Sequence, residues 1–261
     1  MSEPRDGAQK RAWQHLSTLT PARIALGRCG TGLPTRHVLD FAMAHALARD
    51  SVHAAFDAAA LVGAVEGMGL HARRVTSAAT SREVYLRRPD LGRRLSEAGR
   101  ASLLAVARGA TDLVIVVGDG LSATAVHHHA PPLLEALCPL LRERGIGLGP
   151  VVIASGARVA LGDDVGEALD AGLVLVLIGE RPGLSAPDSL GAYLTHTPRV
   201  GRRDAERNCV SNIRDGGLSP AAAAARLAWL IEAARARGLT GVALKDESDA
   251  QLERKAGPVL R

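Results

Sequence analysis

Three continuous apolar runs, each rich in Val, Ile and Leu, are the feature that most restricts how this chain can fold. They span residues 112–117, 150–154 and 173–178, and a polar turn and a segment of helical periodicity follow each of the first two. Strands that are apolar on both faces are typical of parallel sheets covered by helices on both sides. The sequence therefore predicts an α/β fold with an open, mostly parallel, Rossmann-like sheet and helices on both faces.

The pattern divides the chain of 261 residues into three regions. Residues 1–20 are expected to form a polar N-terminal arm, and residues 21–110 a mainly helical N-terminal portion. Residues 111–261 carry the regular alternation of strands and helices and are expected to form the α/β domain.

Three elements are predicted within the N-terminal portion. A long helix is expected to begin at Thr35, whose hydroxyl is a suitable cap. A strand is expected over residues 72–78. Residues 82–107 are expected to be helical in two pieces, because Pro89 pushes the residue before it out of the helical region.

Composition and charge exclude several classes of protein. Aromatic residues make up 2% of the chain, and its 32 Lys+Arg are interspersed with 27 Asp+Glu, so no stacking platform for nucleic-acid bases is expected. No segment approaches the roughly 18 apolar residues that cross a bilayer, and the polar N-terminal residues, which lack an apolar h-region, predict that no signal peptide is present. The expected location is therefore the cytoplasm, without membrane or nucleic-acid partners. The three cysteines form no CxxC pair, which favours reduced thiols.

In an open α/β sheet, ligands bind beyond the carboxyl ends of the strands. Residues 118–124, 155–159 and 179–189 occupy those positions. The first of these segments opens a helix and can hold an anionic or amide-rich ligand. Alone, however, its Gly-Asp-Gly sequence favours a simple tight turn with Ser122 as the helix cap.

The third segment contains two carboxylates, Glu180 and Asp188, for which two interpretations stay open. They can form an acid/base pair. Alternatively, Glu180 accepts hydrogen bonds from a neutral ligand, while Asp188 caps a helix over residues 191–194.

Two other features resemble reactive sites. Residues 127–129 are three histidines, but consecutive helical residues point about 100° apart and cannot all face one ion. With no carboxylate or cysteine nearby to complete a set, a solvated helix face with one half-buried histidine is expected. Cys209 has no evident histidine partner, because nothing in the sequence brings His196 close, so a packing or ligand-contacting thiol is predicted.

Several segments in order resemble the small subunit of ethanolamine ammonia-lyase. The similarity covers about residues 22–247, and each segment is weak alone, whereas the ordered series is specific. The segments are YLRRPDLGRRL at 85–95, DGLSA at 119–123, GERPGLS at 179–185 and RNCVSN at 207–212, with AHALARD at 44–50 and GVALK at 241–245 also fitting.

The resemblance implies an adenosylcobalamin-dependent enzyme that converts ethanolamine to acetaldehyde and ammonia. In this family a large subunit, a TIM barrel, binds ethanolamine, and the small subunit covers the cobalamin at the interface. The expected partners are therefore the large subunit and the coenzyme, with no catalytic residue in this chain and cobalamin contacts within residues 111–261. An exposed apolar surface is expected in a subunit separated from its partner. A bacterial microcompartment stays open as the location.

Position by position, Val159, Glu180 and Cys209 match the coenzyme-contacting residues of the family. Their chemistry suits a corrinoid, which has apolar ring faces surrounded by neutral amide groups. Val159 can make an apolar contact, Glu180 can accept a hydrogen bond, and Cys209 is a small, adaptable side chain. Further candidates from loop position alone are Ser122, Ser185 and Asn208.

No DxHxxG motif is present, which agrees with the base-on coenzyme of the family, in which no protein histidine binds cobalt. No metal ligand is therefore predicted. Two alternatives stay open. One is a stand-alone α/β enzyme for a small polar ligand with Asp119 or Glu180 as the base, and the other is a non-enzymatic binding or scaffold module.

Overall fold

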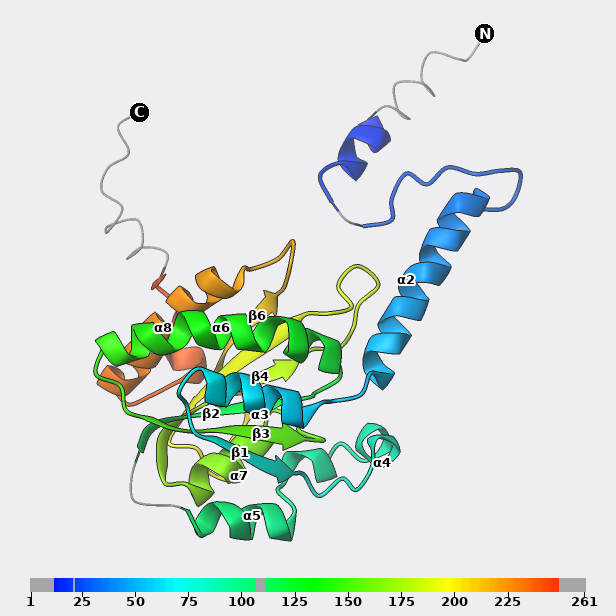
Figure 1. Ribbon diagram of the computed structural model, residues 1–261. Helices are drawn as coiled ribbons and strands as arrows, with labels where there is room; N and C mark the ends of the chain where they lie inside the picture. The colour runs from blue at the N-terminus through cyan, green and yellow to red at the C-terminus, as the bar shows by residue number, and fades with distance from the viewer. Residues whose placement is uncertain (1–11, 21, 107–110, 249–261) are drawn as a thin grey trace, which may run out of the picture.

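The computed structural model describes residues 12–20, 22–106 and 111–248. At its centre lies a six-stranded sheet in the order β1-β3-β2-β4-β5-β6 (Figure 1). The strands are β1 (Ala72–Thr76), β2 (Thr111–Gly118), β3 (Leu148–Ser155), β4 (Ala171–Gly179), β5 (Leu190–His196) and β6 (Arg207–Ile213). The strands β1, β3, β2 and β4 are parallel to one another, whereas β5 pairs antiparallel with both β4 and β6.

The α/β class and the strands predicted from the apolar runs and from residues 72–78 are confirmed, but the sheet is mixed. The predicted helix over residues 191–194 is wrong, because this segment lies inside β5. Leu190, Ala192 and Leu194 alternate toward one buried face, which is the period of a strand. Pairing with the otherwise open edge of β4 satisfies the backbone groups of this segment.

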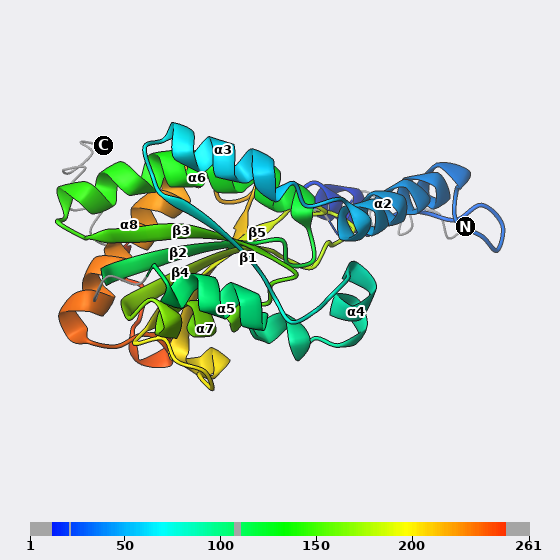
Figure 2. The same ribbon diagram turned by 60° about the horizontal axis from the view of Figure 1, so that its bottom comes forward.

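Helices cover both faces of the sheet (Figure 2) and create two hydrophobic cores. Ile115 and Val117 of β2 face the first core, whereas Val114 and Val116 face the second, which explains why the strand is apolar throughout. The first core is covered by α3 (Ala58–Gly67), α6 (Ala123–Glu143) and α8 (Pro220–Arg237), and the second by α5 (Glu97–Leu104) and α7 (Leu161–Ala168).

The helix α2 (Thr35–His53) projects from the body of the molecule (Figure 1). The predicted Thr35 cap is wrong by one residue: Pro34 occupies the cap position without a side-chain hydrogen bond, and Thr35 is the first helical residue. The break around Pro89 is confirmed, since α4 (Arg82–Arg87) and α5 flank a short 3₁₀ turn. None of the described helices is both long and apolar enough to cross a membrane.

A buried ion pair fastens β6 to α7. The guanidinium of Arg207 donates two hydrogen bonds of 2.6 Å to the carboxylate of Asp163, and the two side chains are 2% and 1% exposed. Arg207 also donates to Thr195 Oγ1 at 2.9 Å and to the carbonyl oxygen of Arg202 at 2.9 Å. This cluster fixes the start of the strand that carries Cys209.

Candidate functional site

The loops after β2, β3 and β4 meet around a cavity of about 440 Å³. Leu121 comes from the first loop, Val159 from the second and Glu180 from the third, and Tyr193 of β5 and Tyr85 of α4 complete the wall. This edge of the sheet is where the sequence places a ligand site, because the carboxyl ends of parallel strands meet there.

The turn after β2 packs directly against the end of β4. The backbone N–H of Leu121 donates to the carbonyl oxygen of Gly179 at 2.9 Å. Gly120 has a φ of +55°, and a Cβ there would lie 2.2 Å from that same carbonyl oxygen. Ser122 caps α6 by accepting from the Ala125 N–H at 3.2 Å and donates to the Pro187 carbonyl oxygen at 3.1 Å. The interpretation of this segment as a tight turn with a helix cap is confirmed.

Asp119 is buried beneath the same turn and is fully engaged. One carboxylate oxygen accepts from the backbone N–H groups of Ala157 at 2.8 Å and Gly120 at 3.1 Å, and the other pairs with Arg82 at 3.2 Å. Burial raises the pKa of Asp119, and the Ala157 N–H and the Arg82 charge oppose that rise. These contacts make Asp119 a structural anchor for the loops after β2 and β3.

Tyr85 makes cation–π contacts with two arginines. The central carbons of the Arg82 and Arg158 guanidinium groups lie over the ring, 4.8 and 4.3 Å from its centroid. The Tyr85 hydroxyl donates to the Ala157 carbonyl oxygen at 3.1 Å, and burial raises the pKa of Tyr85 to about 12. The Arg158 Nε is buried and finds no hydrogen-bond partner among the described residues.

Sequence reasoning did not select Tyr85 or Arg158 as site residues, although both line the cavity. The sequence signal for Tyr85 is the segment 85–95, which begins at this residue and is one of the segments that carry the family resemblance. Arg158 immediately precedes Val159 and lies within the loop after β3.

Glu180 is held in place by the loop and by β6. Its Oε2 accepts from the Ser189 hydroxyl at 2.5 Å and from the backbone N–H of Asn212 at 3.3 Å. Its Oε1 receives no hydrogen bond from the described residues. Glu180 thus presents an oriented acceptor at the cavity wall, as a ligand-binding role requires.

Asp188 neither pairs with Glu180 nor caps a helix, which were the two predicted roles. Because residues 191–194 are a strand, the predicted helix cap is wrong. Instead, the Asp188 carboxylate lies 3.3 Å from Nε2 of His129 on α6.

Val159 and Glu180 line the same cavity, whereas Cys209 lies next to it. Cys209 is the direct partner of Tyr193 in the pairing of β5 with β6. Although Cys209 is exposed, desolvation raises the pKa of its thiol; the Tyr193 hydroxyl opposes this rise and the Glu180 charge adds to it. A thiol that stays protonated is a poor nucleophile, which agrees with the predicted contact role.

The further candidates contribute to local structure. The Asn208 side chain donates to the Leu244 carbonyl oxygen at 2.8 Å and accepts from the Gly241 N–H at 2.8 Å, so it fastens the segment after α8. Ser185 is exposed in a turn between Gly183 and Ala186.

The three histidines have three different environments. His127 Nε2 accepts the backbone N–H of Asp57 at 3.1 Å, His128 is exposed, and His129 is 4% exposed. Only His128 of the three is exposed, so the expected solvated helix face with one half-buried histidine is only partly confirmed. The expectation that no carboxylate lies near them is wrong, because the fold brings Asp188 to His129 across 59 positions of sequence.

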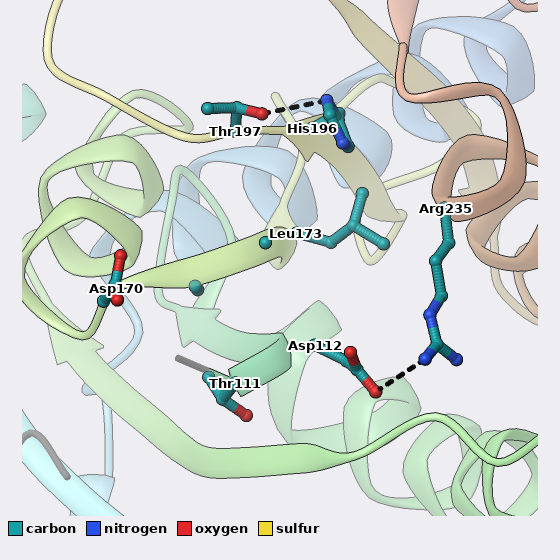
Figure 3. A pocket seen from close by; sticks show the side chains of 9 residues that line it. Thr111, Asp112, Asp170, Leu173, His196, Thr197 and Arg235 are labelled. Carbon is teal, nitrogen blue, oxygen red and sulfur yellow. Dashed lines mark hydrogen bonds and ion pairs between the residues drawn. The ribbon is translucent and has the colours of Figure 1, made fainter. Parts of the chain in front are cut away.

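A second cavity, of about 340 Å³, lies at the opposite, amino ends of β2 and β4 (Figure 3). Its charged groups are largely paired: Asp112 lies 3.4 Å from Arg235 and accepts the Gly147 N–H at 2.8 Å. His196 also lines this cavity, with Nδ1 2.9 Å from the Thr197 hydroxyl. His196 therefore belongs to the other end of the sheet from the 440 Å³ cavity beside Cys209.

Comparison with known proteins identifies the family to which this chain belongs. The family model described as ethanolamine ammonia-lyase light chain matches residues 10–245. The chain belongs to this family. It is 53% identical to the ethanolamine ammonia-lyase small subunit of Bradyrhizobium diazoefficiens over 261 residues, which cover 100% of this chain and 99% of that one. The small subunit of Xanthomonas campestris is 54% identical over 95% of this chain and 91% of its own.

Family membership confirms the resemblance found in the sequence and makes this chain a small subunit of an ammonia-lyase. A small subunit implies a large one. The relative from Pseudomonas aeruginosa, 53% identical over 94% of this chain and 91% of its own, carries the same description.

Proposed function

We propose that this chain holds adenosylcobalamin at the interface with the large subunit of an ethanolamine ammonia-lyase, which converts ethanolamine to acetaldehyde and ammonia. The observation that carries the proposal is the convergence of Val159 and Glu180 on one cavity, with Cys209 adjacent through Tyr193. The family resemblance implies these three residues as coenzyme contacts, and they come from three separate segments of the chain.

The residues around the cavity suit a corrinoid. Val159 offers an apolar contact for a ring face, and Glu180 offers an acceptor for the N–H groups of peripheral amides. The buried Arg158 Nε, which lacks a partner among the described residues, offers a donor for an amide carbonyl oxygen. When bound, the coenzyme supplies radical chemistry through homolysis of its cobalt–carbon bond. Base-on binding, with no protein histidine on cobalt, is part of the proposal.

The size of the cavity supports an interface role. A corrin ring with its nucleotide loop is too large to be enclosed in about 440 Å³, so this chain can contact only part of it. The large subunit would cover the remainder, bind ethanolamine and supply the catalytic residues. Residues 111–261 are the proposed coenzyme-contacting domain, with Tyr85 added from the N-terminal portion, and the proposed location is the cytoplasm or a microcompartment within it.

Exposed apolar side chains on α2 also support a partner. Leu39, Phe41 and Met43 are 63%, 48% and 63% exposed. Apolar groups gathered on a projecting helix are typical of a surface that a second protein covers.

Replacing Glu180 by Ala tests the placement of the coenzyme. We expect the reconstituted two-subunit enzyme to bind adenosylcobalamin about tenfold more weakly, since the loss of one hydrogen bond to a charged acceptor costs about 1.5 kcal/mol. The binding curve is measured by equilibrium dialysis of the coenzyme. Glu83→Gln, which alters an exposed carboxylate on nearby α4, is the matched control and should leave affinity unchanged. Unchanged affinity in the Glu180 variant would remove this residue from the site.

Replacing Cys209 by Ser separates contact from chemistry. If the thiol only packs beside Tyr193 and the coenzyme, ethanolamine deamination should change by less than about threefold. Steady-state rates and coenzyme affinity are measured on the same preparation. Complete loss of activity with normal coenzyme binding would instead assign Cys209 a direct chemical role.

A further inference from the structure

The loop after β4 crosses α6 at a cluster of three potential metal ligands. His128 and His129 come from α6, and Asp188 comes from the loop. One donor atom from each residue lies within 4.8 Å of the other two. Within the cluster, His129 Nε2 lies 3.3 Å from Asp188 Oδ2.

Two of the three ligands are held in position by the fold. The side chain of His129 is 5% exposed and that of Asp188 is 29% exposed. The loop is tied on both sides of Asp188, because Pro187 accepts a hydrogen bond from Ser122 and Ser189 donates one to Glu180. Ligands held in this way lose little conformational freedom when an ion binds.

The third ligand, His128, is exposed and leaves the cluster open to solvent. Its neighbour His127 is not available, because its Nε2 already accepts the Asp57 N–H. The cluster thus differs from the run of three adjacent histidines, which helical geometry prevents from sharing an ion. The cluster contains two of the three histidines, His128 and His129, together with the carboxylate of Asp188 from a distant segment.

The donor set selects the class of ion. Two imidazole nitrogens and one carboxylate oxygen, with a position left for water, suit Zn²⁺ and similar divalent transition metals. Ca²⁺ and Mg²⁺ prefer several oxygen ligands, and only one carboxylate is present. Ligands about 2.1 Å from a tetrahedral ion lie roughly 3.4 Å apart, so the site must close slightly. Rotation of the exposed His128 ring allows this closure.

We propose that His128, His129 and Asp188 bind a divalent transition-metal ion of the zinc class, which fastens the loop 179–189 to α6. The same loop carries Glu180, so an ion at this position would hold the wall of the 440 Å³ cavity. The metal site does not depend on the coenzyme role of that cavity, and it can be tested on the chain alone.

The test is equilibrium dialysis of the full-length, tag-free chain against Zn²⁺, with thiols alkylated so that the cysteines cannot bind the ion. We expect about one zinc per chain in the wild type. His128→Ala and Asp188→Asn should each weaken binding by at least about tenfold, since each removes one of three ligands. His71→Ala, an exposed histidine outside the cluster, should bind as the wild type does.

Circular dichroism checks that the variants fold, and hydrogen exchange provides a second measurement. Zinc should slow amide exchange in residues 183–189 of the wild type but not of Asp188→Asn. Absence of binding by the wild type at about 100 μM Zn²⁺, which means a Kd weaker than about 100 μM, would overturn the proposal. Equal binding by the folded Asp188→Asn variant would overturn it as well.

Discussion

Replacing Arg207 by Ala is expected to lower the free energy of unfolding by about 3–5 kcal/mol. The substitution leaves the carboxylate of Asp163 buried at 1% exposure without its counter-charge. It also removes the hydrogen bonds from Arg207 to Thr195 and to the Arg202 carbonyl oxygen. Because Arg207 begins β6, we expect the strand that carries Cys209 to lose its anchor to α7.

Urea denaturation followed by circular dichroism measures this effect. Arg207→Lys keeps the charge but not the two-point hydrogen bonding, so it should fall between the wild type and the alanine variant. The double variant Arg207→Met with Asp163→Leu should be more stable than Arg207→Ala, because it leaves no buried charge unpaired. A loss below about 1 kcal/mol in Arg207→Ala would mean that the pair contributes little to stability.

Gly179→Ala is expected to have the second large effect. A Cβ at this position would lie 2.1 Å from the Ser122 carbonyl oxygen and 2.7 Å from that of Asp119. Both contacts are with backbone atoms, so a side-chain rotation cannot relieve them. We expect a loss of about 3 kcal/mol or more in unfolding free energy, at the upper end of overpacking effects. Displacement of the adjacent Glu180 should also weaken coenzyme retention in the two-subunit enzyme.

Gly183→Ala is the matched control within the same loop. There the new Cβ would lie 3.8 Å from the nearest atom, which is an ordinary contact distance. Thermal unfolding and coenzyme retention are compared for the two variants. Suppose that Gly179→Ala unfolded at the same temperature as the wild type and retained coenzyme normally. The close contact of Gly179 with the turn at Asp119 and Ser122 would then not be required for the site.

The central part of the fold was predictable because its signals are local. The buried runs of β2, β3 and β4 are apolar at successive positions, and Pro89 interrupts a helical pattern in the sequence itself. The sequence does not predict the strand β5, because Asp188 precedes this segment as a helix cap does. Its conformation is decided by pairing with β4, and strand propensity depends strongly on such distant neighbours.

The candidate site was predictable to the extent that it follows chain order. Val159 and Glu180 lie just after consecutive parallel strands, so the topology brings both to one edge of the sheet. The contacts of Tyr85 were not predictable in this way, since its hydroxyl bonds a residue 72 positions away. The approach of Asp188 to His129 depends likewise on a loop conformation that no local pattern specifies.

Deamination of ethanolamine by the chain co-expressed with its large subunit tests the central claim most directly. The assay is run with and without adenosylcobalamin, alongside the isolated chain. We expect activity only when both the large subunit and the coenzyme are present. Turnover by the isolated chain would contradict the proposed role and would place the catalytic residues in the loops of this chain. Turnover by the two subunits without coenzyme would also contradict it.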